Sequence, residues 1–227
     1  MLTLNVAGRD IDNVFLVDDD PDIRCGYELA ISDLYVSTSE IPAVSSVDQL
    51  VGRATRTDGF ICDLLLSKGR YSPVNGDVIV SELYKKNVPA VLCSRNADTT
   101  NSVRRYRHLI PCVLTDTELN GDTLLKSFAI CIDEFKGVFS DNRKPWHALV
   151  RVESIVAKHQ DCARVALVIP SFDRSHPFEI DVSPSDVPFY SAMMHALEKG
   201  DPYRCKAQVN LEAEGWSDLY IKEWIEV

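Results

Sequence analysis

Short apolar runs alternate with amphipathic segments along the first 135 residues. The runs are nearly continuous, which is typical of strands buried on both faces of a parallel sheet. They lie at residues 14–17, 59–66, 88–94 and 109–114, with a weaker run at 41–47. Apolar residues at helical spacing predict helices between them, at residues 22–33, 47–54, 77–86, 99–106 and 121–135. This alternation predicts an α/β fold with a doubly wound, parallel five-stranded sheet.

The pattern changes after Gly137. Residues 140–145 are polar and turn-forming, as in a linker, and the apolar spacing then predicts helices at 146–158 and 187–198. Strands are predicted at 163–169 and 178–182, while 203–213 alternate apolar and polar residues and predict a half-buried strand paired with 219–227. We therefore expect two domains, 1–138 and 139–227, the second a small α+β domain rich in antiparallel strands.

Charge and composition exclude several classes of protein. The net charge is -10, and by our count residues 140–227 hold 14 acids against 10 bases, so we expect no nucleic-acid partner. No apolar stretch approaches the length of a membrane helix, and the N-terminus lacks a basic signal-peptide start, so we expect a cytoplasmic protein without a membrane partner. The seven cysteines mostly lie in apolar runs and are expected to be reduced and buried.

Three adjacent carboxylates, Asp18, Asp19 and Asp20, follow the first strand. In an open α/β sheet this edge binds ligands, and clustered carboxylates repel one another unless a cation lies between them. Mg²⁺ suits such a site because it prefers oxygen ligands. The alternative is an acidic turn that caps the next helix, whose first turn holds Pro21 and Asp22.

Two later strands also end in polar groups, Asp63 and Ser94. A carboxylate accepts a phosphoryl group only where charge repulsion is cancelled, and a metal held by other acids does this. Each residue alone could simply end a strand or cap a helix. Because parallel strands share their carboxyl edge, we expect both residues to lie near the acidic turn.

The run Phe-Leu-Val-Asp-Asp-Asp-Pro, Asp63 placed 45 residues after Asp18, and Ser94 placed 31 after Asp63 resemble the receiver domain of bacterial response regulators over about residues 10–137. The resemblance implies a flavodoxin-like fold and a signalling role with a histidine kinase or other signalling protein as partner. It implies that Asp63 is the phosphoacceptor, that Ser94 is the switch hydroxyl, and that Mg²⁺ is held by Asp18, Asp19, Asp63 and the backbone carbonyl of Leu65.

The chain departs from that family in two places. The family has a lysine at the end of strand five, whereas Val113-Leu114-Thr115-Asp116 has none and adds an acid. A phosphorylated Asp63 would then lack its usual counter-charge. The loop after Asp63 is also longer and holds Lys68 and Arg70, which either pair with phosphate in place of the lysine or belong to a solvated surface loop.

Three functions fit these observations. The first is a response-regulator-like protein whose receiver part controls a C-terminal domain that does not bind DNA. The second is a pseudo-receiver scaffold that acts through protein contacts, with a homodimer through the last receiver helix as one form. The third is an enzyme, since Asp18 and Asp20 also resemble the acid pair of haloacid dehalogenase-type phosphohydrolases. The later lysine and acidic pair of that family are not convincing here, so the sequence favours a non-enzymatic role.

Overall fold

The computed structural model describes residues 2–66, 70–94 and 103–227. The chain divides into two compact units. The described residues of 2–94 and 109–139 form the first unit, and 103–108 and 140–227 form the second. The segment 103–108 therefore belongs to the second unit although it lies between two strands of the first in sequence.

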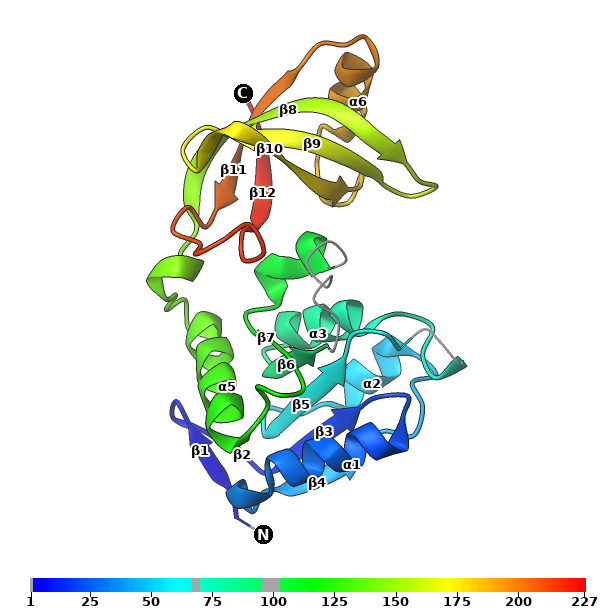
Figure 1. Cartoon of the computed structure of the whole chain (residues 1–227), viewed down its shortest axis with the longest axis vertical. Helices are drawn as coiled ribbons and strands as arrows, with labels where there is room; N and C mark the ends of the chain where they lie inside the picture. The colour runs from blue at the N-terminus through cyan, green and yellow to red at the C-terminus, as the bar shows by residue number, and fades with distance from the viewer. Residues whose placement is uncertain (1, 67–69, 95–102) are drawn as a thin grey trace. The chain divides into compact units, whose positions relative to one another are not determined.

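The first unit is built on a parallel sheet of five strands (Figure 1). In chain order these strands are β3 (Asn13–Val17), β4 (Ser37–Glu40), β5 (Asp58–Asp63), β6 (Ala90–Cys93) and β7 (Val113–Leu114). Their order across the sheet is β4-β3-β5-β6-β7. Numbered along the chain this is 2-1-3-4-5, the flavodoxin-like doubly wound order. The predicted fold class is confirmed.

In the described part of the chain, four α-helices complete the first unit: α1 (Pro21–Ala30), α2 (Val47–Arg53), α3 (Gly76–Lys85) and α5 (Gly121–Phe135). The predicted span 121–135 is confirmed, because Asn120 and Thr123 form a capping box that starts α5 and Phe128 and Ile132 bury its apolar face. Tyr27 and Ile31 bring α1 and η1 (Ser32–Leu34) into the same core. An antiparallel hairpin not predicted from the sequence, β1 (Leu4–Val6) and β2 (Arg9–Ile11), precedes the sheet.

The predicted strand at residues 41–47 is wrong. The strand of this region is β4, whose four residues Ser-Thr-Ser-Glu carry no apolar signal. It lies at the edge of the sheet and pairs with β3 alone, so polar side chains are tolerated there. Residues 41–46 instead form an irregular connection to α2.

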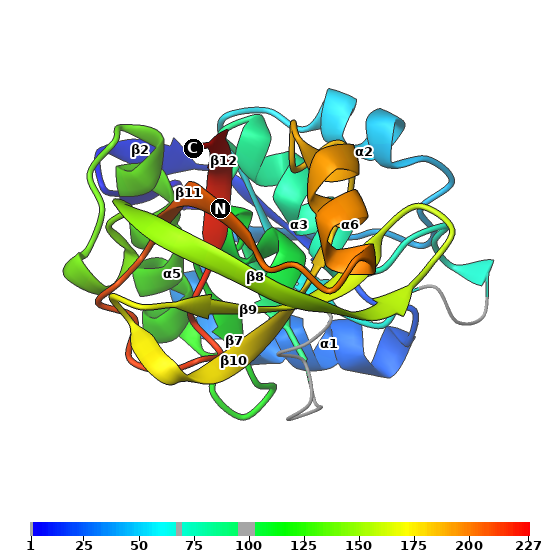
Figure 2. The same ribbon diagram turned by 90° about the horizontal axis from the view of Figure 1, so that it is seen from above.

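In its described residues, the second unit is built on one antiparallel sheet, against which the α-helix α6 packs. Its elements are η3 (Arg104–Leu109), whose last residue lies in the first unit, η4 (Asp141–Arg143), β8 (Trp146–Lys158), β9 (Ala163–Ile169), β10 (Asp173–Val182), α6 (Tyr190–Glu198), β11 (Tyr203–Val209) and β12 (Ile221–Glu226). The order β10-β9-β8-β11-β12 places the fourth strand beside the first, a Greek-key arrangement. The turned view in Figure 2 shows α6 beside the long strand β8, and Met193 and Leu197 enter the core with the buried sheet residues. No α-helix in the described parts of the chain is long and apolar enough to cross a bilayer.

The predicted helix at residues 146–158 is wrong, because this span is the strand β8. Its buried residues at the start are Ala148, Val150 and Val152, which alternate as in a strand facing one core. Two register shifts against β9 then interrupt the alternation. The interrupted pattern imitates helical spacing. The antiparallel pairing of β11 with β12 is as predicted.

Candidate functional site

The carboxyl ends of three neighbouring strands bring the predicted residues to one edge of the sheet. Val17 pairs with Cys62, and Asp63 pairs with Cys93. Asp18 therefore follows β3 beside the end of β5, and Ser94 follows β6 on the other side of Asp63. The structure brings Asp18, Asp63 and Ser94 to the same edge, as the parallel topology requires.

Asp18 is fully buried, with no exposed side-chain area. Its Oδ1 accepts a hydrogen bond from the backbone N–H of Asp20 at 2.8 Å, and its Oδ2 accepts one from the hydroxyl of Tyr27 at 3.1 Å. Its backbone carbonyl accepts a hydrogen bond from the guanidinium of Arg24. Both carboxylate oxygens therefore have donors from within the turn and from α1.

The pKa of Asp18 is raised to about 6. Burial is the main cause, because it disfavours the charged form, and the charges of Asp63 and Asp19 raise the pKa further. The hydrogen bonds from Asp20 and Tyr27 act in the opposite direction and are outweighed. The negative charges of Asp63 and Asp19 thus disfavour ionisation of Asp18. A cation at this edge would favour the ionised form and lower the pKa of Asp18.

Asp19 and Asp20 are both exposed. The Oδ1 of Asp20 accepts a hydrogen bond from the backbone N–H of Asp22 at 2.9 Å and caps α1, with Pro21 as the first helical residue. The capping interpretation of the acidic turn therefore holds for Asp20. The side chain of Asp19 makes no hydrogen bond or ion pair with the residues that the structure describes.

Asp63 is held in place by its own loop. Its Oδ2 accepts a hydrogen bond from the backbone N–H of Leu65 at 2.8 Å, and the backbone N–H of Leu64 donates to the carbonyl of Cys93 at 3.0 Å. The backbone of Gly76 lies against that of Asp63, so that a Cβ added to Gly76 would come within 1.9 Å of the carbonyl oxygen of Asp63. A glycine at the start of α3 therefore allows the close approach of α3 to the backbone of Asp63.

Ser94 is buried, and its backbone N–H donates to the carbonyl of Leu114 at 2.9 Å. This bond ties the end of β6 to the end of β7. Beyond β7, Asp116 is exposed, and its charge contributes to the raised pKa of the Cys93 thiol, which is mainly due to burial. An acid, rather than the expected lysine, therefore acts on this edge from the fifth strand.

The longer loop after Asp63 is described only in part, since Lys68 lies outside the described residues. Arg70 is exposed and has a left-handed backbone, with φ 64°. The following Tyr71 is buried, and its hydroxyl donates to the carbonyl of Ile41, while its carbonyl accepts from the N–H of Val44 at 2.8 Å. The end of the loop is thus anchored on the connection between β4 and α2.

Two residues at this edge were not predicted from the sequence, Arg24 and Tyr27. Arg24 is buried, donates to the carbonyl of Asp18, and pairs its Nε with Glu40 at 2.7 Å. Tyr27 is buried and is a hydrogen-bond donor, since burial raises the pKa of its hydroxyl. The sequence shows that both residues lie in the predicted helix, four and seven residues after Asp20. It does not show which face of α1 contacts the acidic turn.

The donor set at this edge consists of oxygen atoms, which suits Mg²⁺. Within the described part of the chain, no group of three or more acidic, histidine or cysteine side chains is placed to hold one metal ion together. Mg²⁺ commonly takes only one or two protein carboxylates and keeps water for its other positions. A Mg²⁺ ion at this edge would therefore use only some of the predicted ligands and take water at its other positions.

Comparison with solved structures finds receiver domains over the first unit. A CheY-like response regulator receiver domain from Methanospirillum hungatei is 13% identical and covers 56% of this chain and 98% of its own, with a TM-score of 0.42. A receiver domain from Clostridium thermocellum is 12% identical over 56% of this chain and 98% of its own, with a TM-score of 0.43. A Burkholderia pseudomallei response regulator with a phosphorylated aspartic acid and a calcium ion is 12% identical over 56% and 71%, with a TM-score of 0.41.

No family model and no curated protein matches the chain. The strand order of the first unit is the flavodoxin-like order that the resemblance to receiver domains implied.

Proposed function

We propose that this chain is a response-regulator-like signalling protein in which the first unit controls the second, and in which the second unit does not bind DNA. Asp63 is the proposed phosphoacceptor and Ser94 the switch hydroxyl, with a histidine kinase or other signalling protein as the partner. The path of the chain between β6 and β7 is the observation that supports control of the second unit most directly.

Strands β6 and β7 are parallel neighbours, so the chain must cross over between them. This crossover begins at Ser94, the proposed switch residue, and its residues 103–108 pack in the second unit. A change at the end of β6 is therefore connected to the second unit by a short length of chain. This connection supports control of one unit by the other.

Arginines attach the crossover segment, residues 103–108, to the second unit. Arg104 donates to the carbonyl of Glu179 at 2.9 Å, and its guanidinium lies 4.9 Å from the ring centre of Phe178. Arg105 binds the carboxylate of Asp186 at 2.9 Å and the hydroxyl of Ser183 at 2.7 Å. These contacts involve β10 and the turn after it, so the segment is a structural part of the second unit.

The end of the segment, at Arg107 and His108, is bound by buried side chains. The guanidinium of Arg107 is buried and pairs with Asp218 at 2.8 Å. The buried Arg143 donates to the carbonyls of Arg107 and His108, at 3.0 and 3.4 Å, and lies 4.9 Å from the ring centre of Tyr220. Breaking this end exposes a buried guanidinium and two carbonyls, which opposes spontaneous release.

We predict that Arg143→Met releases the crossover segment. It removes two charge-assisted hydrogen bonds, so local opening should rise by about tenfold or more. Limited trypsin digestion of the full chain, followed by mass spectrometry, should show correspondingly faster cleavage at Arg104, Arg105 and Arg107, because cleavage tracks the open population. Lys144→Met removes a neighbouring exposed charge and should leave the rate unchanged. Equal rates for both variants would contradict the prediction.

At the acidic edge, the residues proposed to hold Mg²⁺ are Asp18, Asp19, Asp63 and the carbonyl of Leu65. The ion would neutralise charge between the carboxylates and the incoming phosphoryl group. The residues of this chain place Asp63 through Leu65 and Gly76 and present Ser94 beside it. Asp116 supplies no counter-charge, so the acyl phosphate should be held weakly, with Lys68 and Arg70 as the proposed substitute cations.

The second candidate is a pseudo-receiver scaffold that acts by partner binding, with a homodimer as one form. The acid at the end of β7 and the raised pKa of Asp18 favour it, because both oppose the gathering of negative charge. The phosphohydrolase alternative has no such support, since Asp20, its intended acid/base, is exposed and caps α1.

Treatment with acetyl phosphate and Mg²⁺ tests the proposal. Intact mass should show a phosphoryl adduct in the wild type that is absent in Asp63→Asn, with a yield below one per chain. Asp116→Asn, which removes the like charge, should raise that yield. In the modified protein, trypsin should cut faster at Arg104, Arg105 and Arg107.

No Asp63-dependent adduct under these conditions would favour the scaffold. An adduct that leaves both the cleavage rate and the size in solution unchanged would contradict control of the second unit. If the adduct is stoichiometric, Lys68→Ala with Arg70→Ala should abolish it. Failure of that double variant to do so would remove both residues from the site.

A further inference from the structure

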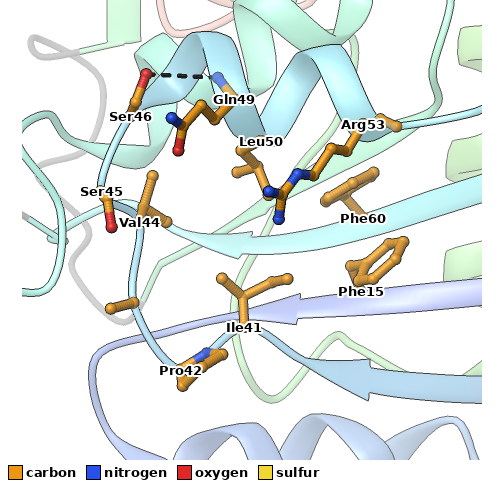
Figure 3. Close-up of a pocket in the computed structure, with 12 residues that line it drawn as sticks. Phe15, Ile41, Pro42, Val44, Ser45, Ser46, Gln49, Leu50, Arg53 and Phe60 are labelled. Carbon is orange, nitrogen blue, oxygen red and sulfur yellow. Dashed lines mark hydrogen bonds between the residues drawn. The ribbon is translucent and has the colours of Figure 1, made fainter.

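A pocket of about 350 Å³ lies in the first unit between α2 and the sheet (Figure 3). Its lining includes none of Asp18, Asp63 and Ser94, so it is separate from the acidic edge. Apolar side chains form most of it, and the ligand-sized volume is in the range of small-molecule sites. The apolar lining residues whose side chains Figure 3 labels are Phe15, Ile41, Pro42, Val44, Leu50 and Phe60.

The sequence leaves this space open because α2 is short. It has seven residues, of which only Val51 is buried, so it covers little of the sheet beneath it. The connection of residues 41–46 that leads into α2 is irregular and contains Pro42. On the sheet, Phe15 stacks on the buried Phe60 with ring centres 4.9 Å apart and planes at 25°. The half-buried ring of Phe15 is therefore fixed in orientation.

One cation is directed into this apolar pocket. Figure 3 shows the guanidinium of Arg53 extended between Leu50 and Ile41, toward the middle of the space. Within the described part of the chain, Arg53 makes no ion pair and no hydrogen bond through its side chain. Arg53 is exposed, as is Arg56, but of these two residues Arg53 is the one that lines the pocket. The protein carries a net charge of -10, yet no acid of the described chain pairs with Arg53. Its guanidinium can therefore bind an anion from outside the protein.

We propose that this pocket binds an aromatic carboxylate. The flat ring system lies on Phe15 among the aliphatic side chains, and the carboxylate pairs with the guanidinium of Arg53, which matches it in two-pronged geometry. A single guanidinium carries one positive charge, which balances one carboxylate but only part of the charge of a phosphate, so a carboxylate fits better than a phosphate. The volume suits one or two fused rings. The pocket does not include Asp63 and needs no phosphotransfer there.

Calorimetric titration of the full chain with 2-naphthoate tests whether the pocket binds an aromatic carboxylate. 2-Naphthalenemethanol, which has a similar shape but no charge, is the control ligand. The wild type should bind naphthoate saturably and the alcohol about tenfold or more weakly, because a hydrogen-bonded charge pair contributes about that factor. Arg53→Gln should weaken naphthoate to the level of the alcohol. Arg56→Gln, an equal charge change at an exposed residue outside the lining, should not.

Leu50→Trp should fill the pocket and remove binding of both compounds, and an unchanged melting temperature shows that it still folds. Naphthoate that fails to bind the wild type saturably would overturn the proposal. Equal affinity of naphthoate and the alcohol, or of the wild type and Arg53→Gln, would overturn it as well. Loss of binding in Asp63→Asn would move the site to the acidic edge and overturn it too.

Discussion

Gly76→Ala is expected to destabilise the first unit by about 3 kcal/mol, at the upper end of overpacking effects. The added methyl would lie 1.9 Å from the carbonyl oxygen of Asp63 and 2.9 Å from its carbonyl carbon, both of them backbone atoms. No side-chain rotation relieves such an overlap, so β5 and α3 must move apart. The hydrogen bond from Gly76 N–H to the carbonyl of Leu64, 2.9 Å long, should weaken with it.

Gly26→Ala provides the matched control. Gly26 lies within α1, and an added Cβ would meet nothing within 4 Å. It should stabilise the protein by about 0.5–1 kcal/mol, since alanine is the better helix former. Urea unfolding followed by circular dichroism measures both, and Gly76→Ala should also lower the yield of phosphoryl adduct on Asp63. A Gly76→Ala protein as stable as the wild type would show that α3 is not packed on Asp63 as described.

Asp18→Asn is expected to stabilise the metal-free protein at pH 7.5 by about 2–3 kcal/mol. The pKa of Asp18 is raised from 3.8 to about 6 in the folded state, so between these values the native state holds a proton that the unfolded state has lost. The free energy of unfolding therefore falls as pH rises through this window. Asparagine has no charge to bury, and its amide can donate to the Tyr27 hydroxyl while its oxygen still accepts from Asp20.

The carboxyl ¹³C shift of Asp18, followed by nuclear magnetic resonance, measures the pKa directly. Urea unfolding from pH 4 to 8 should show the loss of stability in the wild type and in Asp19→Asn, an exposed control, but not in Asp18→Asn. Millimolar Mg²⁺ should lower the pKa of Asp18 if the ion binds at this edge. If Asp18 titrated near pH 4, the described burial of its carboxylate would be contradicted. If Mg²⁺ left the pKa of Asp18 unchanged, the metal site would be contradicted.

The placement of Asp18, Asp63 and Ser94 could be predicted because it depends on a property that each strand carries by itself. An apolar run that ends in a polar residue marks the carboxyl edge, and parallel strands share that edge. The helix 121–135 was predictable for a similar reason, since its cap and its apolar face lie within fifteen residues. Local signals that agree with each other identify such elements reliably.

The sequence could not predict features whose partners lie far away along the chain. Arg104, Arg105 and Arg107 form a basic cluster, and the acids and carbonyls they bind lie 75 to 111 residues further on. The strand β8 was predicted as a helix because its register shifts are set by pairing with β9. The pocket beneath α2 arises from how little of the sheet that helix covers, which its length alone does not reveal.

The route of the crossover through the second unit bears on how such a protein can evolve. Two domains joined end to end can be exchanged as whole cassettes by recombination at the junction. Here an exchange of residues 140–227 would remove the groups that Arg104, Arg105 and Arg107 bind. A truncation at residue 139 would remove the rest of the unit in which residues 103–108 pack. The two units are therefore expected to be inherited together, and substitutions in the segment to be matched by substitutions around Asp186 and Asp218.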